Sequence, residues 1–390
     1  MIYLDSNATT RPDPAVILAM REMLEERWHN PSSIHRLGQA ARQKVELARQ
    51  SVARLIGAQP RDIILTSGAT ESIDLAIRGT LLASPLTKRT IVTTAIEHEA
   101  IRDLCKALSN DSARPIEVRH LPVMEGGVVD AEALHDLLDD SVAIVSVQWA
   151  NNETGAIQPI ERIGAICRER GIPCHSDGTQ WVGKLPVDVA SAPIDFLSFS
   201  AHKFHGPKGA GALYFRPRSR FRPVIHGSQE RERRGGTENT AGIVGMGVAA
   251  EVVREWLADP ANRQAVARKR DRLEKAILDA VPDAVVNAPA DRSQRLWNTA
   301  NIGFPRLEAE ALLLLMSERG VCASAGAACS SGSLEPSPIL RAMHVPPERA
   351  HGSIRLSLSR YTTDEEVDQA VAIIVQCVER LRSSVSALSG

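Results

Sequence analysis

The stretch FLSFSAHKFHGPKGAG, residues 196–211, decides the fold and places the chemistry. Its first four residues, 196–199, form an apolar run typical of a short buried strand, and the glycines and proline at 206–209 end regular structure. Lys203 therefore lies where a predicted strand gives way to a loop. Partial burial there disfavours the charged form of the amine and lowers its pKa, so that it can condense with an aldehyde. A solvated loop lysine is the ordinary alternative.

Strands and helices alternate on both sides of this stretch. The predicted strands are 63–65, 90–94, 116–120, 142–147, 173–176, 196–199 and 211–215, with helices at 70–82, 99–108, 131–138 and 159–170. This alternation predicts an α/β fold with a mostly parallel seven-stranded sheet covered by helices on both faces. Ligands of such sheets bind beyond the carboxyl ends of the strands, which is where the polar motifs of this chain fall.

A domain boundary is predicted where two long helical patterns, 241–257 and 261–281, break at Asp259 and Pro260. We expect a large cofactor-binding domain of residues 15–258. Residues 1–14 and 261–390 form a smaller α/β domain that carries a loop of small residues at 323–335. Its predicted elements are strands at 299–303 and 353–358 and helices at 307–319, 336–343 and 363–381.

Composition excludes several classes of protein. The 390 residues include 46 Lys and Arg against 47 Asp and Glu, a balance that gives no sign of nucleic acid or an anionic membrane as the main partner. The N-terminus lacks the pattern of a signal peptide, and no apolar run is long enough to cross a bilayer. The six cysteines show no zinc-ligand spacing. We expect a cytoplasmic protein with reduced thiols and no resident metal.

Two motifs indicate a phosphate site. The segment TSGATE, residues 66–71, follows a predicted strand and opens a helix, whose free N–H groups and dipole favour an anion. Ser67 and Thr70 add hydroxyl donors. RRGGTEN, residues 233–239, offers a further contact before another helix. An ordinary capped helix and a solvated charge run remain the alternatives for the two segments.

Four further side chains follow predicted strands. His98 is an imidazole that can stack on a planar cofactor and move protons, although a solvated histidine is the commoner case. Asn152 is a donor to a phenolate or a carboxylate, or simply a turn residue. Asp177, if it faces a pyridine nitrogen, keeps that ring protonated, and otherwise it caps a helix. Gln180 lies three residues further on.

Two residues of the smaller domain complete the chemistry. Cys329 stands among small residues in GAACSSGS, residues 326–333, which predicts an exposed, mobile loop with a thiol that becomes nucleophilic if its pKa falls. The other five cysteines sit in apolar patterns typical of a core. Arg355, inside a predicted strand, can bind a carboxylate through two parallel hydrogen bonds from its guanidinium, or it can pair with a surface acid.

Taken in order, the motifs resemble those of the class I cysteine desulfurases, enzymes that use pyridoxal 5'-phosphate and have the aspartate aminotransferase-like fold type I. The resemblance covers nearly the whole chain. Its motifs are LDSNATT, TSGATES, EH, NNETG, DGTQ, SFSAHKFHGPKGAGALY, RRGGTEN, ACSSGSLEPSPILRAM and SIRLSLSRYTT.

The resemblance implies a role for each matching residue. Lys203 would bond to the cofactor, and Cys329 would take the sulfur as a persulfide. Ala69, Thr70, Ser200 and His202 match phosphate contacts, and Thr237 matches a contact from a neighbouring subunit. Asp177 matches the partner of the pyridine nitrogen, Gln180 and Asn152 the contacts of the ring oxygen, His98 the stacking and proton-transfer histidine, and Arg355 and Asn152 the substrate clamp. Cys329 would also be able to ligate an iron–sulfur cluster transiently.

The chain departs from the family pattern in ways that leave its reactive groups in place. Gly178 follows Asp177 where the family usually has alanine, Ala201 stands where glycine is common, and Ser330 where threonine is common. The segment 226–230 is one residue shorter than the glycine-rich family version. The segment after Leu381 is also short, which puts the docking of a scaffold protein in doubt.

The implied activity is removal of sulfur from L-cysteine, giving L-alanine and a persulfide that a homodimeric enzyme passes to an iron–sulfur scaffold or a sulfur carrier. Selenocysteine lysis and cystine or cysteine β-lysis on the same fold are the nearest alternatives, and neither needs a mobile thiol. A non-catalytic sulfur-trafficking scaffold is the alternative of another class. Such a protein is expected to have lost Lys203 or Cys329, and both are present.

Overall fold

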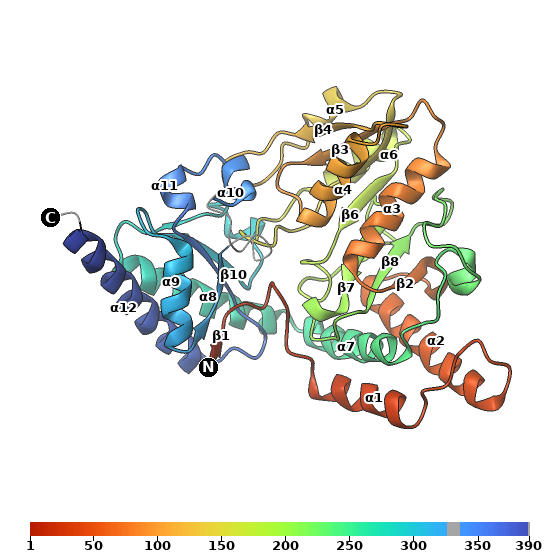
Figure 1. Ribbon diagram of the computed structural model, residues 1–390, viewed down its shortest axis with the longest axis horizontal. Helices are drawn as coiled ribbons and strands as arrows, with labels where there is room; N and C mark the ends of the chain where they lie inside the picture. Colours follow the sequence, from red (N-terminus) through yellow and green to blue (C-terminus); the bar gives the residue numbers. More distant parts are fainter. Residues whose placement is uncertain (326–335, 389–390) are drawn as a thin grey trace.

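The computed structural model describes residues 1–325 and 336–388 of the chain (Figure 1). Its largest sheet has seven strands in the order β2-β8-β7-β6-β5-β3-β4. In chain order the bounds are β2 Ile63–Thr66, β3 Thr90–Thr94, β4 Glu117–Leu121, β5 Val142–Ser146, β6 Cys174–Asp177, β7 Phe196–Ser200 and β8 Gly211–Phe215. Only β8 runs against its neighbours β7 and β2, so the prediction of a mostly parallel seven-stranded sheet is confirmed.

The strands alternate their side chains between two separate apolar layers, as a sheet covered on both faces requires. In β2, Ile63 and Leu65 join one core cluster, which also contains side chains of α2, α6 and α7. Ile64 points the other way, into the cluster formed with α3 and α4. The helices of this part are α1 Pro14–Glu25, α2 Arg36–Ile56, α3 Ala69–Ala83, α4 Glu99–Ser109, α5 Leu134–Leu137, α6 Ile160–Glu169 and α7 Thr240–Ala258.

A smaller unit lies beside the large sheet and contains the chain termini (Figure 1). Its four-stranded sheet has the order β12-β13-β10-β9, and β1 pairs in parallel with β11. The strands are β1 Ile2–Tyr3, β9 Val285–Val286, β10 Thr299–Gly303, β11 Val321–Cys322, β12 Ser324–Ala325 and β13 Ser353–Ser357. The helices are α8 Pro260–Ala280, α9 Ala309–Glu318, α10 Pro338–Ala342, α11 Pro347–Ala350 and α12 Asp364–Leu388.

A third apolar cluster belongs to this smaller unit, and it includes Ile2 and Leu4 from the N-terminus. The first residues of the chain thus pack with its last third. Helix α7 ends at Ala258, and the side chain of Asp259 accepts a hydrogen bond from the Ala261 N–H, which caps α8. These observations support our proposal of two domains, 15–258 and 1–14 with 261–390.

The structure corrects several element bounds. The helix predicted at 131–138 shrinks to the four residues of α5, and the helix predicted at 363–381 extends as α12 to Leu388. The two-residue strands and α11 were not predicted. Throughout the described ranges, every helix is too short or too polar to traverse a lipid bilayer.

Candidate active site

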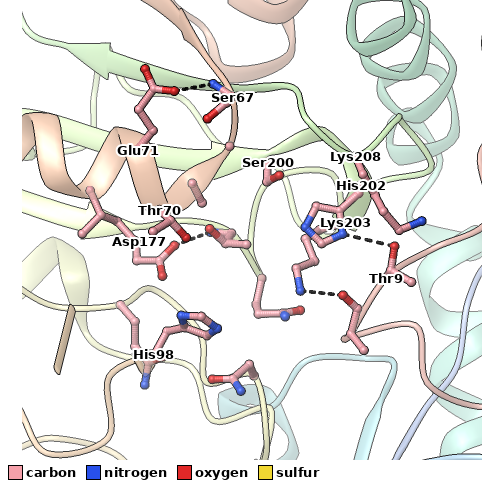
Figure 2. Close-up of a pocket in the computed structure, with 18 of the residues that line it drawn as sticks. Thr9, Ser67, Thr70, Glu71, His98, Asp177, Ser200, His202, Lys203 and Lys208 are labelled. Atoms are coloured by element: carbon pink, nitrogen blue, oxygen red, sulfur yellow. Dashed lines mark hydrogen bonds between the residues drawn. The ribbon is translucent and has the colours of Figure 1, made fainter. Parts of the chain in front are cut away.

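A cavity of about 590 Å³ opens at the carboxyl ends of β6 and β7 and the start of α3 (Figure 2). Nine of the residues predicted for the site line it: Ala69, Thr70, His98, Asn152, Asp177, Gln180, Ser200, His202 and Lys203. Figure 2 shows Asp177 and His98 on one side of it and Lys203, His202 and Thr9 on the other. The sheet brings them together because parallel strands end at the same edge.

One end of the cavity is built to receive an anion. Gly68 precedes α3 without a side-chain cap, so the first N–H groups of that helix are not occupied by one. A Cβ at Gly68 would meet only Ser200 Oγ, 3.8 Å away, so the space in front of this turn is open. Behind it, a Cβ at Gly211 would lie 2.6 Å from Gly68 Cα, and glycine there lets β8 approach the turn.

The same turn is tied to the segment 233–239. Glu71 accepts from the backbone N–H of Ser67 at 2.8 Å and from Arg234 Nε at 2.6 Å. These hydrogen bonds outweigh burial and keep the pKa of the Glu71 carboxyl below its usual value. Thr237, predicted as a contact from a second subunit, does not line this cavity and is exposed three residues beyond Arg234.

Lys203 ends the short 3₁₀ turn Ala201–Lys203 that follows β7. Its Nζ donates to the backbone carbonyl of Asn7 at 2.7 Å and to that of Ala8 at 2.9 Å. The amine is therefore held by the N-terminal arm at the edge of the cavity. The position agrees with the strand-end lysine predicted from sequence.

His202 and Lys208 add positive or donating groups near the same end. His202 Nδ1 lies 3.2 Å from Thr9 Oγ1, which fixes the ring. Burial, with the nearby charges of Lys203 and Lys208, lowers the pKa of His202 to about 4, so the imidazole is neutral at neutral pH. Lys208, which sequence reasoning assigned no role, lines the cavity as well.

Asp177 is the last residue of β6, and its carboxylate lies at the cavity. Its Oδ1 accepts from the backbone N–H of Thr179 at 2.9 Å, and its backbone carbonyl accepts from Trp149 N at 2.9 Å. Both contacts fix the residue at the strand end. The helix-cap alternative does not apply, because no helix begins at this residue.

His98 caps α4 through Nδ1, which accepts the backbone N–H of Ala100 at 3.1 Å. In the neutral ring the hydrogen therefore resides on Nε2, the nitrogen left for the cavity. Burial lowers the pKa of His98 and outweighs the opposing effect of Asp177. The neutral ring therefore presents Nε2–H to the cavity as a hydrogen-bond donor, and accepting a proton at Nε2 requires the other tautomer, which gives up the cap.

Arg355 lies next to the cavity, behind Asn152. Its Nη1 donates to the Asn152 backbone carbonyl at 3.1 Å, and its Nη2 donates to Asp5 Oδ1 at 2.7 Å and to Ser324 Oγ at 3.1 Å. The Arg355 Nε is buried without a partner, as is Asn152 Oδ1. The ion-pair alternative for Arg355 thus holds in this structure, although its acid is in the N-terminal arm rather than on the surface.

Cys329 lies outside the described residues. The described residues that flank it are nevertheless tied to the neighbourhood of the cavity. On one side Ser324 Oγ donates to Asp5 Oδ1 at 2.6 Å, beside Arg355. On the other side Ser337 Oγ donates to Glu153 Oε2 at 2.6 Å, next to Asn152.

The N-terminal arm is the part of the site that sequence reasoning missed. Asp5 holds Arg355, Asn7 and Ala8 hold Lys203, and Thr9 holds His202. The motif LDSNATT belongs to the family pattern, but a short polar segment without periodicity carries no signal of what it contacts. Its pairing with β11 and Ser357 places it against the site.

Pyridoxal phosphate fits the groups that this cavity presents. The uncapped start of α3, with Thr70, Ser200 and His202, suits a phosphate. A carboxylate, an imidazole and a lysine amine face the remaining space, and Asn152 Oδ1 is a buried polar atom without a protein partner. The open space before Gly68 leaves room for the phosphate group.

Comparison with known proteins agrees with this fit. The aminotransferase class-V family matches residues 2–370. A solved NifS-like protein superposes with a TM-score of 0.90 at 37% identity, covering 97% of this chain and 100% of its own. A structure titled "SspA in complex with cysteine" matches with a TM-score of 0.80 at 33% identity, covering 93% of this chain and all of the other. The fold is that of the pyridoxal-phosphate-dependent enzymes of fold type I.

Curated relatives narrow the class. A cysteine desulfurase of Nostoc sp. is 47% identical over 384 residues, which is 98% of this chain and 94% of the relative. The cysteine desulfurase NifS of Azotobacter vinelandii is 46% identical over the same shares of both chains. The chain belongs to the cysteine desulfurases of the class-V aminotransferase family.

Proposed function

We propose that this protein takes sulfur from L-cysteine, releases L-alanine and holds the sulfur as a persulfide on Cys329 for transfer to an acceptor. One observation carries the proposal: the amine of Lys203, the carboxylate of Asp177 and the imidazole of His98 face a single cavity beside an uncapped helix start. The NifS-like relatives extend over nearly the whole chain, and they support the same activity.

The cofactor would be held at three points. The α3 N-terminus, Thr70, Ser200 and His202 would bind the phosphate. The Asp177 carboxylate would keep a proton on the ring nitrogen, and Gln180 and Asn152 would contact the ring oxygen. When bound, pyridoxal phosphate withdraws electrons from the α-carbon of an amino acid and so makes its proton removable.

The proton at the substrate α-carbon would be taken by Lys203 Nζ, which the carbonyls of Asn7 and Ala8 hold at the cavity edge. Arg355 would bind the substrate carboxylate, oriented by Asp5 and by the Asn152 carbonyl. His98 would act in the later steps through Nε2, as a hydrogen-bond donor while Nδ1 caps α4 and as a proton carrier only when that cap is released.

Sulfur transfer would be the work of Cys329. Its thiolate would attack the substrate sulfur, so that an S–S bond forms while the carbon–sulfur bond breaks, and the electron pair of the broken bond remains on the substrate carbon. Proton uptake there would complete alanine. The persulfide would then be available to an iron–sulfur scaffold or another sulfur carrier.

We also propose that the protein is a homodimer in the cytoplasm. Thr237 is exposed, as expected of a residue that reaches a second subunit. Large apolar side chains on and near α1 and α2 are exposed as well, among them Leu18 at 67%, Trp28 at 67% and Ile34 at 96%. A second copy of the chain is the occupant we expect there. The five described cysteines are all free thiols, which fits a reducing compartment.

The deciding experiment is mass spectrometry of the peptide that carries Cys329 after treatment with L-cysteine. One added sulfur is expected, together with alanine in solution. Pyruvate and ammonia in place of alanine would indicate β-lysis and overturn the proposal. Cys329→Ser should keep the visible band of the cofactor but release no sulfide under thiol, whereas Lys203→Ala should lose the covalently bound cofactor.

A further inference from the structure

Lys184 is a buried lysine just behind the cavity. Its side chain is only 4% exposed. The backbone around it is fixed, because Trp297 Nε1 donates to the Lys184 carbonyl at 2.7 Å and the preceding Gly183 has φ +80°. A Cβ at Gly183 would lie 2.3 Å from Phe204 Cβ, so this turn packs closely against the segment just after Lys203.

The Lys184 amine has amide oxygens as its hydrogen-bond partners. Nζ donates to Asn7 Oδ1 at 2.7 Å and to Gln180 Oε1. In the described part of the chain no acidic side chain forms an ion pair with it. Burial, and then the positive charges of Lys203 and Arg355, lower the pKa of Lys184 well below its usual value. His205 is the neighbouring titratable ring that its charge affects.

These contacts determine whether the oxygen or the nitrogen of the Gln180 side-chain amide faces Lys184. An N–H of Lys184 needs an acceptor, so Oε1 is turned toward Lys184. Nε2 donates one hydrogen to the backbone carbonyl of Asn7 at 3.0 Å, which is an acceptor only. The second hydrogen of Nε2 is left for a ligand in the cavity, because Gln180 is one of the residues that line it.

Asn7 joins this arrangement to the reactive amine. Its backbone carbonyl accepts from both Gln180 Nε2 and Lys203 Nζ, while its side-chain oxygen accepts from Lys184 and from Asn298 Nδ2. Its Nδ2 donates to Thr299 Oγ1 at 2.9 Å and to the Asn152 carbonyl at 3.1 Å. With every polar atom of its side chain engaged, Asn7 cannot turn to accommodate a different Gln180 orientation.

We propose that Lys184 is a positioning residue that acts through Gln180: it keeps the Gln180 N–H directed at the ring oxygen of bound pyridoxal phosphate. The proposal rests on the proposed function, which places that oxygen beside Gln180. Without the Lys184 donor, Gln180 Oε1 is a buried acceptor lacking its partner, and the Asn7 carbonyl alone still orients the amide. The ring oxygen then loses a hydrogen bond whenever the amide turns away.

The test is a double-mutant cycle on the cofactor-loaded protein, read by the pH midpoint of its visible absorption. A ring oxygen that loses a hydrogen-bond donor carries a more concentrated negative charge. That charge raises the pKa of the proton bound next to the oxygen, and the pH midpoint of the absorption change rises with it. Lys184→Met and Gln180→Leu should each raise the midpoint by about one pH unit. Together they should raise it no further than either alone, because both remove the same hydrogen bond.

The control is Lys275→Met, which removes a lysine whose side chain is 75% exposed on α8 and should leave the midpoint unmoved. Shifts that add in the double variant, or an unmoved midpoint in Lys184→Met, would overturn the proposal. If Lys184→Met does not fold, as judged by thermal unfolding of the cofactor-free protein, Lys184→Leu, which also lacks a donor, is read by the same criteria. Absence of any Lys203-dependent visible band in the unmodified protein would instead refute the proposed function.

Discussion

Ser337 offers a sharp test of how the chain beyond Cys329 is held against the site. Its Oγ accepts from the N–H groups of Ile339 and Leu340, at 3.1 and 3.4 Å, and so caps α10. The same hydroxyl donates to Glu153 Oε2 at 2.6 Å. Ser337→Ala removes the cap and the contact between the two parts of the structure in one step.

The loss of local stability expected in Ser337→Ala follows from these contacts. Loss of a helix cap costs about 1 kcal/mol. Loss of the donor to the buried Glu153 carboxyl costs about 1–3 kcal/mol more, because the acceptor is left without a partner. Burial already raises the pKa of Glu153, and removal of the Ser337 hydrogen bond should raise it further. The lower end of the summed cost, about 2 kcal/mol, corresponds to about a 30-fold rise in opening of α10.

Two assays measure the consequences. Hydrogen exchange followed by mass spectrometry should show faster exchange across α10 in Ser337→Ala. The kcat for sulfide release should fall about tenfold, since attack on sulfur needs the reacting atoms within about 3–3.5 Å. The visible band of the cofactor should be unchanged, because Ser337 does not line the cavity.

Asp259→Ala is the matched control. It also deletes a helix cap, since Asp259 Oδ1 accepts from Ala261 N at 2.9 Å, but it lies on the exposed start of α8. It should speed exchange at α8 and leave kcat unchanged. Equal kcat values for the two variants would refute the reasoning, because the Glu153 contact would then have no part in sulfur transfer.

Three further predictions concern the clamp, the core and pH. Arg355→Ala should raise KM for L-cysteine by about tenfold or more, and an unchanged KM in steady-state assays would remove it from the clamp. Glu230→Gln breaks a buried ion pair with Arg49, at 2.6 Å, and should cost about 3 kcal/mol in urea unfolding. Glu251→Gln, in a more exposed pair, should cost under about 1 kcal/mol. Burial lowers the pKa of His202 and His205 to about 4, below the value of about 6.5 in an unfolded chain, so the unfolded state binds their protons first. Stability of the cofactor-free protein should be full above about pH 6.5 and fall toward pH 4, and a flat urea midpoint from pH 6.5 to 5 would contradict this.

The sequence predicted the large sheet well because its strands are dictated locally. The runs 90–94 and 211–215 match β3 and β8 residue for residue, since Arg89 precedes the β-branched first run and Arg216 follows the largely apolar second one. The side chains after these strands could be placed at one edge for the same reason. Parallel strands end together, so Asp177, Lys203 and His98 were expected to meet, and they line one cavity.

The remaining parts depend on partners distant in sequence. β1 has two residues and exists through its pairing with β11, more than three hundred positions away. The predicted helix at 131–138 loses half of its length, and only Leu134–Leu137 is helical. Lys184 looks like a surface lysine in sequence, and only the packing of Trp297, Asn7 and Gln180 around it shows that it is buried.

The N-terminal arm explains how the two proposed domains contribute to one site. Asp5 contacts Arg355 of β13, and Asn7 contacts Lys203, Lys184 and Asn152 of the larger domain. The arm itself packs with the smaller domain through Ile2 and Leu4. Movement of one domain against the other would therefore carry the carbonyls that hold the Lys203 amine. The geometry of the Lys203 amine and the position of Arg355 are consequently set together by Asp5, Asn7 and Ala8, which lie outside any helix or named strand.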